Sequence, residues 1–301
     1  MTPPQISAIL VNYNAGRELA RALRSIADEL ADQRWEAVVV DNASSDGSAE
    51  VVAAFAPNVL LQRNERNTGF ARGVNQGLAA TSGSLVLLMN PDCRLVSGAF
   101  GMLRRELERS HSYAIAGPRI LNPDGTVQGS ARGDPDMFTG LFGRTTMLRR
   151  LFPDLAVARR NVVSGDGARS GDGSVTVDWL SGACLLARRD ALQRVNGFDE
   201  RYFLYWEDAD LCRRLRELGV QVRYVPAATA VHRVGQSSRG VRASSIRAFH
   251  ESAYLYYATH VASGSPPKRR LARILLAVRC WLHLRLGIQD TPDGRVGAVD
   301  A

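Results

Sequence analysis

The chain has 301 residues, of which 45% are hydrophobic and 23% charged, as in an ordinary soluble globular protein. Its length allows one large domain or two smaller ones. The net charge of +8 indicates an anionic partner, for which nucleic acid, anionic lipid and phosphorylated small molecules are all candidates.

The pattern of cysteines and of apolar residues bears on the compartment. The four cysteines are scattered without a Cys-x-x-Cys pair, which fits a reducing compartment and argues against a disulfide framework or a zinc ribbon. Residues 1–5 lack the features of a signal peptide, and no run of about 18 apolar residues predicts a membrane span. We therefore expect a cytoplasmic protein.

The first ninety or so residues alternate short apolar runs with segments of helical spacing. In chain order these predict strand 6–11, a helix with Leu19, Leu23, Ile26 and Leu30 on one face, strand 38–40, a short helix at 51–55, strand 59–62, a helix from Phe70 to before Gly83, and strand 85–89. Such alternation predicts an α/β, Rossmann-like fold whose mainly parallel sheet carries helices on both faces. Neither a Gly-x-Gly-x-x-Gly nor a Walker loop occurs, so the two common phosphate-binding loops are absent.

The fourth strand ends in a candidate ligand site. The unbroken apolar run Leu85 to Met89 predicts a strand buried on both faces, and Asn90, Pro91 and Asp92 follow it directly. Ligands of open α/β sheets bind beyond the carboxyl ends of strands. A Mg²⁺ or Mn²⁺ ion that also holds a diphosphate needs only one or two protein carboxylates. Asp92 is therefore a candidate metal ligand, with helix or turn capping as the alternative.

The second half of the chain is less regular. Its expected elements are a helix at 97–110, an ordered segment at 114–120, a loop-rich insertion at 130–174, an ordered segment at 177–186, a helix at 189–195, an aromatic run at 202–206, a helix at 207–218, extended segments at 222–225 and 230–232, and helices at 247–261 and 268–287. We expect a domain over 1–235 that contains the insertion, and a C-terminal helical extension over 236–301.

The helix at 268–287 is amphipathic and basic. A helical wheel places its large aliphatic residues on one face: Leu271, Ile274, Leu275, Val278, Leu282 and Leu286. The wheel places the basic residues on the opposite face: Arg269, Arg270, Arg273, Arg279 and His283. Two explanations remain open, an anionic membrane surface or packing against the domain or an oligomer partner.

Three further positions carry groups suited to chemistry. Asp41 follows the second strand, where an acid can bind a ribose or a base but can also cap its own loop. Glu207 and Asp208 begin a helix, and either can serve as a general base or simply compensate the helix dipole. His232 ends a short extended segment and can be structural or a metal ligand that favours manganese.

Together these motifs resemble family 2 glycosyltransferases of the GT-A fold, and most of all their bacterial rhamnosyltransferase branch. The resemblance rests on residues 11–14 (VNYN), 40–48 (VDNASSDGS), 67–75 (NTGFARGVN), 90–92 (NPD), 179–183 (WLSGA) and 197–211 (GFDERYFLYWEDADL), within a match over roughly residues 6–235. Position 90 is an asparagine where the family's Asp-x-Asp motif begins with aspartate.

The resemblance implies a role for each matching residue. Nucleotide-sugar binding is implied for Asn12, Asn14, Asp41, Arg72, Asn75 and Asn90. A divalent metal, Mn²⁺ or Mg²⁺, is implied at Asp92 and His232. Asp208 is the implied catalytic base, with Glu207 as the alternate base or an acceptor contact. The acceptor side is implied for Trp179, Gly182 and Trp206.

The implied activity is an inverting transfer of L-rhamnose from dTDP-L-rhamnose to a lipid-linked or cell-wall glycan, with UDP-galactofuranose or UDP-N-acetylglucosamine as alternative donors. We expect a peripheral position on the inner face of the plasma membrane through residues 268–287, with a homo-oligomer possible. A nucleotide-dependent oxidoreductase would also explain the α/β pattern, but its glycine fingerprint is missing. A nucleic-acid-binding protein would explain the charge, but no known nucleic-acid motif occurs.

Overall fold

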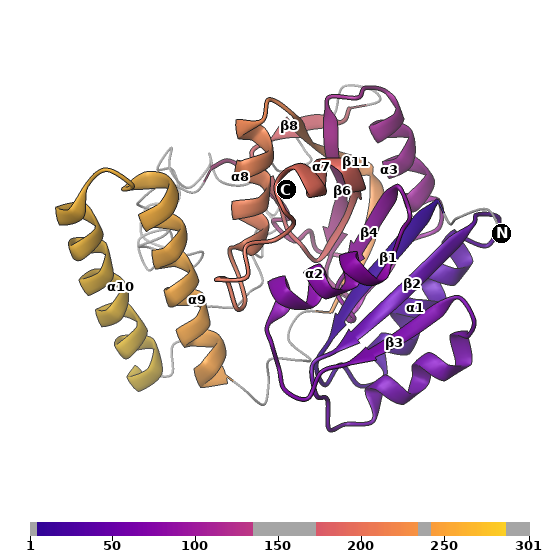
Figure 1. Ribbon diagram of the computed structural model, residues 1–301, viewed down its shortest axis with the longest axis horizontal. Helices are drawn as coiled ribbons and strands as arrows, with labels where there is room; N and C mark the ends of the chain where they lie inside the picture. The colour runs from indigo at the N-terminus through magenta and orange to yellow at the C-terminus, as the bar shows by residue number, and fades with distance from the viewer. Residues whose placement is uncertain (1–4, 135–172, 234–241, 287–301) are drawn as a thin grey trace, which may run out of the picture.

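The computed structural model describes residues 5–134, 173–233 and 242–286. A central sheet is covered by helices on both faces, and a helical hairpin stands at one side (Figure 1). Most of the insertion expected at 130–174 and the tail beyond 286 lie outside the described residues. The expected domain boundary at residue 235 also lies outside them and stays a prediction.

Parallel strands form one half of the main sheet. In the described part of the chain its order is β3-β2-β1-β4-β10-β6-β11-β5, with β8 paired to β11. These strands are β1 (Ile6–Asn12), β2 (Trp35–Asp41), β3 (Val59–Arg63), β4 (Leu85–Met89), β5 (Cys93–Leu95), β6 (Tyr113–Leu121), β8 (Val175–Val177), β10 (Cys184–Arg188) and β11 (Gln221–His232). The first four are mutually parallel, as predicted, and β10 runs antiparallel between β4 and β6.

A second, small sheet and the helices complete the described elements. β7 (Ala131–Arg132) pairs with β9 (Trp179–Leu180). The helices are α1 (Glu18–Glu29), the 3-10 helix η1 (Ser48–Phe55), α2 (Phe70–Ala80), α3 (Ala99–Glu108), α7 (Arg189–Arg194), α8 (Glu207–Glu217), α9 (Arg242–Tyr256), the π-helical η4 (Tyr257–Val261) and α10 (Pro266–Leu286).

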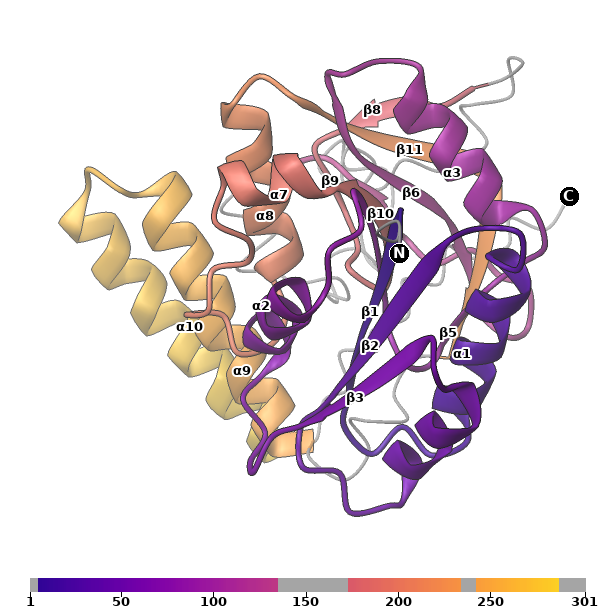
Figure 2. The ribbon, with the colours of Figure 1, turned by 45° about the vertical axis from the view of Figure 1, so that its right-hand side comes forward.

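The alternation of strand residues explains the two layers of helices. In β1, Ile6, Ala8 and Leu10 pack with residues of α1 and α3, whereas Ile9 and Val11 pack with residues of α2, α7 and α8. Successive strand side chains point to opposite faces, so a wholly apolar strand fills two cores. Figure 2 shows α1 and α3 on one face of the sheet and α2 and α8 on the other.

Several boundaries differ from the expected ones. The two extended segments expected near 222–225 and 230–232 are one strand, β11, whose pairing with β6 shifts register between Val225 and Thr229. Alternation breaks at that irregularity, which explains why the sequence suggested two pieces. The helix expected at 247–261 begins at Arg242 and turns π-helical at Tyr257. Three short strands, β5, β7 and β9, carry too few residues for a recognisable pattern.

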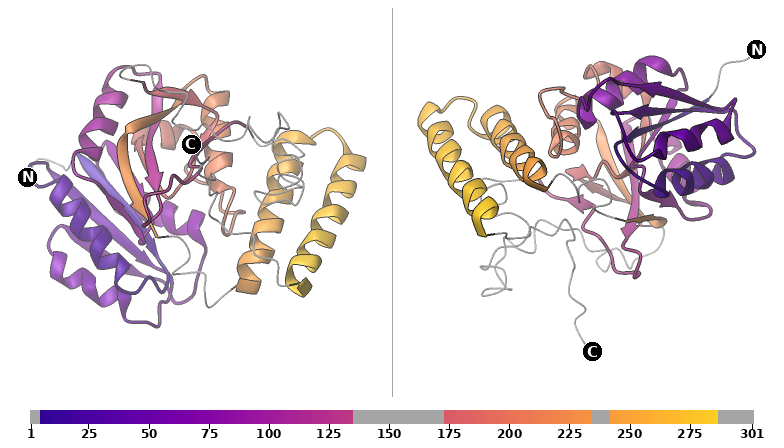
Figure 3. Two further views of the ribbon diagram at one scale, coloured as in Figure 1. Left: turned by 180° about the vertical axis from the view of Figure 1, so that it is seen from behind. Right: turned by 90° about the horizontal axis from the view of Figure 1, so that it is seen from below.

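The C-terminal helices α9 and α10 form a hairpin beside α8 (Figures 1 and 3). The residues of α10 that are buried in this hairpin are Ala272, Leu276 and His283. His283, which the helical wheel groups with the basic residues, is thus buried in the hairpin, and its ring lies 5.4 Å from that of His250 in α9. The row of large aliphatic residues that shares one face of α10 points away from α9 and is exposed.

Candidate active site

The carboxyl ends of β1 and β2 bring Asn12, Asn14 and Asp41 together, as predicted. Asn12 Nδ2 donates to Asp41 Oδ1 at 2.7 Å and to the hydroxyls of Ser44 and Ser48. Asp41 Oδ2 accepts from the Ser44 backbone N–H, and only 1% of Asp41 is exposed. Asn14 Oδ1 accepts from the Ser45 backbone. These side chains therefore shape the 42–48 loop, and their contact with a nucleotide stays a prediction.

One acceptor in this cluster has no partner among the residues that the structure describes. Asn12 Oδ1 is buried and forms no hydrogen bond with them, whereas the amide nitrogen of the same side chain is fully used. An unsatisfied buried acceptor costs about 1–3 kcal/mol, and Asn12 is 0% exposed, so a ligand could use this oxygen only if the surrounding 42–48 loop moved.

The loop before α2 contacts the aromatic segment before α8. The Phe70 N–H donates to the Phe203 carbonyl at 2.8 Å, and Asn42 Nδ2 donates to the Gly69 carbonyl. Gly69 has a φ of +88°, and a Cβ there would lie 2.5 Å from the Phe203 carbonyl oxygen. Only glycine permits both this backbone conformation and this approach. The contact joins the end of the parallel half-sheet to the first turn of α8.

We expect Gly69→Ala to lower the free energy of unfolding by about 1–3 kcal/mol, because it adds backbone strain and displaces Phe203. Transfer activity should fall with it, since α8 loses its support. Chemical denaturation measures the first effect. Gly101→Ala is the matched control, because a Cβ at Gly101 meets nothing nearer than Arg105 Nη1 at 3.6 Å. Equal stability of the two variants would contradict the prediction.

Strand pairing places Asp92 next to His232. His232 in β11 is paired with Cys93 in β5. His232 and Asp92, the residue before Cys93, therefore lie close together beyond the end of β4. His232 Nε2 lies 3.1 Å from Asp92 Oδ1 and 3.4 Å from Asn90 Nδ2. Asp92 is 9% exposed, so the carboxylate is partly withdrawn from water. The structure thus brings together three residues that were predicted to bind metal or donor.

Gln128 fixes the orientation of the His232 ring. His232 Nδ1 lies 3.0 Å from Gln128 Oε1, which can only accept, so Nδ1 carries the proton. Gln128 Nε2 in turn donates to Asn122 Oδ1 and to the His232 carbonyl. The Nε2 lone pair of a neutral ring therefore faces Asp92, an arrangement that is stable when a cation or a proton lies between them. A metal-bound histidine typically donates its other nitrogen in this way.

These residues fit a divalent cation that takes most of its ligands elsewhere. Among the residues that the structure describes, no group of three or more His, Cys, Asp and Glu side chains could hold a metal. One carboxylate and one imidazole suit an ion that keeps open positions for a diphosphate. Next to Asp92 lies a pocket of about 300 Å³ whose lining includes Arg21, Arg94 and Arg233. Glu18 also lines this pocket and lies within ion-pair distance of Arg21 and Arg233, so the arginines are partly neutralised within the protein.

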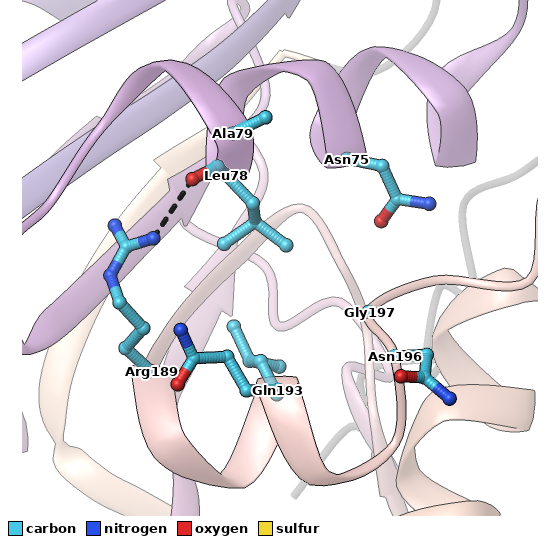
Figure 4. Close-up of a pocket in the computed structure, with 8 residues that line it drawn as sticks. Asn75, Leu78, Ala79, Arg189, Gln193, Asn196 and Gly197 are labelled. Atoms are coloured by element: carbon cyan, nitrogen blue, oxygen red, sulfur yellow. Dashed lines mark hydrogen bonds between the residues drawn. The ribbon is translucent and has the colours of Figure 1, made fainter.

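A second hollow, of about 360 Å³, lies between α2 and α7 (Figure 4). Its polar groups are bonded within the protein: Arg189 donates to the Leu78 and Gly83 carbonyls, and Asn75 is bonded to Phe198. The Arg189 backbone N–H donates to Ser84, just before β4, whereas Asp92 follows the far end of that strand. This hollow is therefore separate from Asp92, although Asn75, a predicted nucleotide-sugar contact, lines it.

Glu207 and Asp208 begin α8 but lie in different environments. Glu207 is buried, its Oε2 has no hydrogen-bond partner among the described residues, and burial raises the pKa of its carboxyl well above the ordinary value, with a further rise from Asp208. Asp208 is half-exposed, and its two oxygens accept from the backbone N–H groups of Gly182 (2.9 Å) and Ala209 (2.8 Å). The environment of Glu207 thus favours its neutral form, and Asp208 is the one suited to act as a base.

The segment Gly182–Ala183 connects Asp208 to the end of β4. Gly182 donates to Asp208, and the Ala183 carbonyl accepts from the Asn90 N–H at 2.9 Å. Asp208 and the Asn90–Asp92 turn are thus held against the same two residues. The predicted base and the predicted metal ligand face one edge of the sheet, where the ends of β1, β2 and β4 also lie.

The sequence matches the model for glycosyl transferase family 2 over residues 7–164, just over half of the chain, and that for glycosyl transferase family group 2 over residues 143–251. An N-acetylglucosaminyl-diphospho-decaprenol L-rhamnosyltransferase of Mycobacterium tuberculosis is 33% identical over 310 aligned positions, which cover 98% of each chain. The chain belongs to glycosyltransferase family 2.

Solved structures confirm the predicted GT-A fold of this family 2 glycosyltransferase. GalNAc-T7, solved with UDP, GalNAc and Mn²⁺, superposes with a TM-score of 0.60 at 16% identity, over 95% of this chain and 57% of that one. The mannosyltransferase PcManGT of Pyrobaculum calidifontis, solved with GDP-Man and Mn²⁺, gives 0.57 at 18% identity, over 94% of this chain and 71% of that one.

Other predicted residues of the glycosyltransferase have structural contacts. Asn75 Nδ2 donates to the Phe198 carbonyl and to Glu200, so it secures the loop after α7. Arg72 lies 3.9 Å from the same Glu200. Trp179 is 7% exposed and donates to the Gly133 carbonyl. Their roles in donor and acceptor binding stay predictions, and for Trp179 burial leaves little surface for a ligand.

Trp206 faces the C-terminal hairpin of the glycosyltransferase. Its ring lies 5.9 Å from Phe249 and 5.4 Å from Tyr256, both in α9. Tyr205 and Trp206 each have a φ of +69°, a backbone conformation that costs a non-glycine residue about 1 kcal/mol or more. The stacking on α9 offsets that strain. Acceptor contact by Trp206 stays a prediction.

The sequence did not point to two residues that shape the site. Gln128 has no distinguishing neighbours in the chain, and its role follows only from its contact with His232. His260, in η4, contacts Asp210 Oδ1 through Nε2 at 2.7 Å, and both side chains are buried. Asp210 also accepts from Arg214 Nε, one turn further along α8. No sequence signal links residue 260 to residue 210.

Proton linkage at Glu207 gives a test of its environment. In the unfolded chain the Glu207 carboxyl has the ordinary glutamate pKa of about 4.3. Because burial raises the pKa in the folded state, stability is greatest below that value and falls as the pH rises toward the folded pKa. Glu207→Gln has no such proton to lose. We expect its Tm to match the wild type near pH 4 and to exceed it by about 2 °C or more near pH 8.

Thermal unfolding monitored by circular dichroism at both pH values measures this difference. The control is Glu217→Gln at the exposed end of α8, where Glu217 pairs with Arg213 on the surface. A Tm gap that does not grow with pH would show that Glu207 is ionised in the folded protein.

Proposed function

We propose that this glycosyltransferase moves L-rhamnose from dTDP-L-rhamnose to a hydroxyl of a polyprenyl-diphosphate-linked glycan, with inversion at the anomeric carbon. The supporting observation is that Asp208 and the Asn90–Asp92 turn are held against Gly182–Ala183, so that a base and an anion-binding edge face each other. The similarity to a decaprenol-linked rhamnosyltransferase over 98% of both chains supports the choice of sugar and acceptor. The acceptor lipid would place the enzyme at the inner face of the plasma membrane.

Each group has a role in a single displacement. Asp208 takes the proton from the acceptor hydroxyl as its oxygen attacks the anomeric carbon, and dTDP leaves from the opposite face. Asp92 and His232 would hold a divalent cation, Mn²⁺ or Mg²⁺, which when bound neutralises charge on the leaving diphosphate. Asn90 lies beside them and can donate to a diphosphate oxygen through Nδ2. Asp41, Asn12 and Asn14 lie one and two strands away, about 5–10 Å, where a nucleoside would extend.

The test is release of nucleoside diphosphate from a panel of donors in the presence of Mn²⁺. Slow hydrolysis of dTDP-L-rhamnose, faster than that of UDP-galactofuranose or UDP-N-acetylglucosamine, is expected, together with binding of dTDP and not of NAD. Release from a UDP-sugar alone would move the proposal to that donor. Binding of neither dTDP nor UDP would contradict it altogether.

A further inference from the structure

α10 carries an apolar surface that the rest of the described protein does not cover. Seven large apolar side chains of this helix are between 37% and 66% exposed: Leu271, Ile274, Leu275, Val278, Trp281, Leu282 and Leu286. They account for more than half of the exposed large hydrophobic residues in the described part of the chain. Isolated exposed apolar residues are normal, but a continuous row of this size marks an interaction surface. We call these seven residues the α10 face.

The position of α10 leaves this face open. The helix packs on α9 and η4 and lies on the far side of α9 from the central sheet (Figures 1 and 3). The side chains buried in this contact are Ala272, Leu276 and His283, which at 100° per residue lie about 120° around the helix from the centre of the α10 face. Packing against the domain therefore uses a different side of the helix.

The charges around the face identify its partner. α10 contains six basic residues and no acidic one: Lys268, Arg269, Arg270, Arg273, Arg279 and Arg285. At 100° per residue, Arg270 borders the α10 face on one side, and Lys268 and Arg279 border it on the other. Arg273 lies over Tyr254 at 5.4 Å and Arg279 over Phe249 at 5.8 Å, which directs both toward the rim between the helices. Long basic side chains bury their stems beside apolar surface and keep their charge at a polar interface.

We propose that α10 is an in-plane docking helix for a bilayer that contains anionic phospholipid. Its apolar face would enter the boundary between headgroups and acyl chains, and the bordering arginines would contact lipid phosphates. Trp281, with Arg285 above its ring at 5.9 Å, has the amphipathic character that favours this boundary. None of the helices in the described part of the chain has the length and apolarity to cross a bilayer, so α10 lies along the surface.

A second copy of the chain fits this surface less well. Two such helices facing each other would bring twelve basic groups together without an acid on either α10 to pair with them, and like charges at close range are repulsive. Anionic phospholipid supplies the missing opposite charge.

Docking also fixes the distance of the active site from the membrane. α9 connects α10 to α8 through the stacking of Trp206 and the buried contact of His260 with Asp210. Ser252 Oγ donates to the Leu204 carbonyl in the same region. The first turn of α8, which carries Asp208, is therefore held firmly to the docking hairpin. This role of α10 in positioning the active site rests on the proposed lipid-linked acceptor, whereas the binding of α10 to vesicles does not.

The test uses the full chain and phosphatidylcholine vesicles with or without phosphatidylglycerol, separated by flotation. The wild type is expected to bind only vesicles with phosphatidylglycerol, and less at high salt. Ile274→Ser with Val278→Ser should weaken binding at least about tenfold, because two apolar side chains that would be buried in the bilayer are replaced by polar ones. Leu60→Ser is the matched control, since Leu60 in β3 is 54% exposed and Ile274 is 61% exposed. Brominated lipid should quench the tryptophan fluorescence of the wild type through Trp281. This quenching should be lost after Trp281→Phe.

The contribution of charge has its own pair of variants. Lys268→Gln with Arg270→Gln should weaken binding by about tenfold or more, at about 1 kcal/mol for each charge near the surface. Arg17→Gln with Arg24→Gln changes the net charge equally on exposed positions near and in α1 and should bind as the wild type does.

Three results would overturn docking. The first is no binding to either kind of vesicle, and the second is binding of the serine variant as strong as that of the wild type. The third is a dimer, detected by sedimentation, that the two serine substitutions dissociate and the other variants do not. Donor hydrolysis is measured without vesicles, so loss of docking with intact hydrolysis leaves the proposed function standing.

Discussion

Asp208→Asn is expected to lower the rate of sugar transfer by about 10²–10⁴-fold while the affinity for nucleotide stays unchanged. The substitution removes the proton-accepting group and changes little else. The asparagine oxygen can still accept from the Gly182 N–H, which holds the wild-type carboxylate at 2.9 Å. The position in the first turn of α8 is half-exposed, so no buried charge is created or lost. Transfer is measured with donor and acceptor at saturation, and binding by calorimetry with dTDP.

Glu207→Gln is the matched control for this experiment. Glu207 is adjacent in sequence and the same carboxylic chemistry is removed, but burial and the Asp208 charge raise the pKa of Glu207 and so favour its neutral form. A neutral amide in place of a neutral acid should leave transfer within a few-fold of the wild type. If Glu207→Gln abolishes transfer and Asp208→Asn retains it, the two roles are reversed. Equal Tm values for Asp208→Asn and the wild type exclude unfolding as the cause of lost activity.

This pair shows where prediction from sequence ends. The sequence placed both acids at the start of a helix after an aromatic run, and the structure has α8 beginning at Glu207. It could not separate them, because adjacent residues on a helix point in directions about 100° apart and only the surroundings decide which is buried. The surroundings here are distant segments of the chain, Gly182 among them, whose contact with Asp208 depends on the folded sheet.

The same limit applies at the metal site. The strand ending at Asp92 was predictable, since an uninterrupted apolar run followed by Asn-Pro-Asp is a local pattern. The geometry of the site is not local, because Asn90 and His232 are 142 positions apart. The pairing that joins them involves β5, which has three residues and no pattern of its own. From its position alone His232 could equally be structural or a metal ligand, the resemblance singled it out as a ligand, and Gln128 was not found at all.

α10 shows a third kind of limit. Periodicity predicted correctly that its aliphatic residues share one face, since that depends only on helix geometry. Periodicity does not say which face a neighbouring helix covers. The hairpin with α9 covers a narrow strip made of Ala272, Leu276 and His283 and leaves the wider apolar face exposed.

Asp92→Ala is expected to abolish the dependence of dTDP binding on Mn²⁺. In the wild type we expect chelation of the metal to weaken binding of dTDP by at least about tenfold, because the ion offsets the charge of the diphosphate. The variant should bind dTDP weakly with or without Mn²⁺, since His232 alone offers one ligand. Calorimetric titration with dTDP, with Mn²⁺ or EDTA present, gives the four affinities.

Two further variants separate loss of metal from loss of structure. Asp32→Ala removes an exposed carboxylate beyond α1 and should keep the metal dependence intact. Gln128→Leu leaves both proposed ligands but removes the acceptor that holds the proton on His232 Nδ1. The ring is then free to place its proton on Nε2, where it pairs with Asp92 and competes with the cation, so the Mn²⁺ concentration for half-maximal dTDP binding should rise about 10–100-fold. If Asp92→Ala still responds to Mn²⁺ as the wild type does, the cation is held elsewhere, and the close approach of Asp92 to His232 is an ion pair of a protonated histidine.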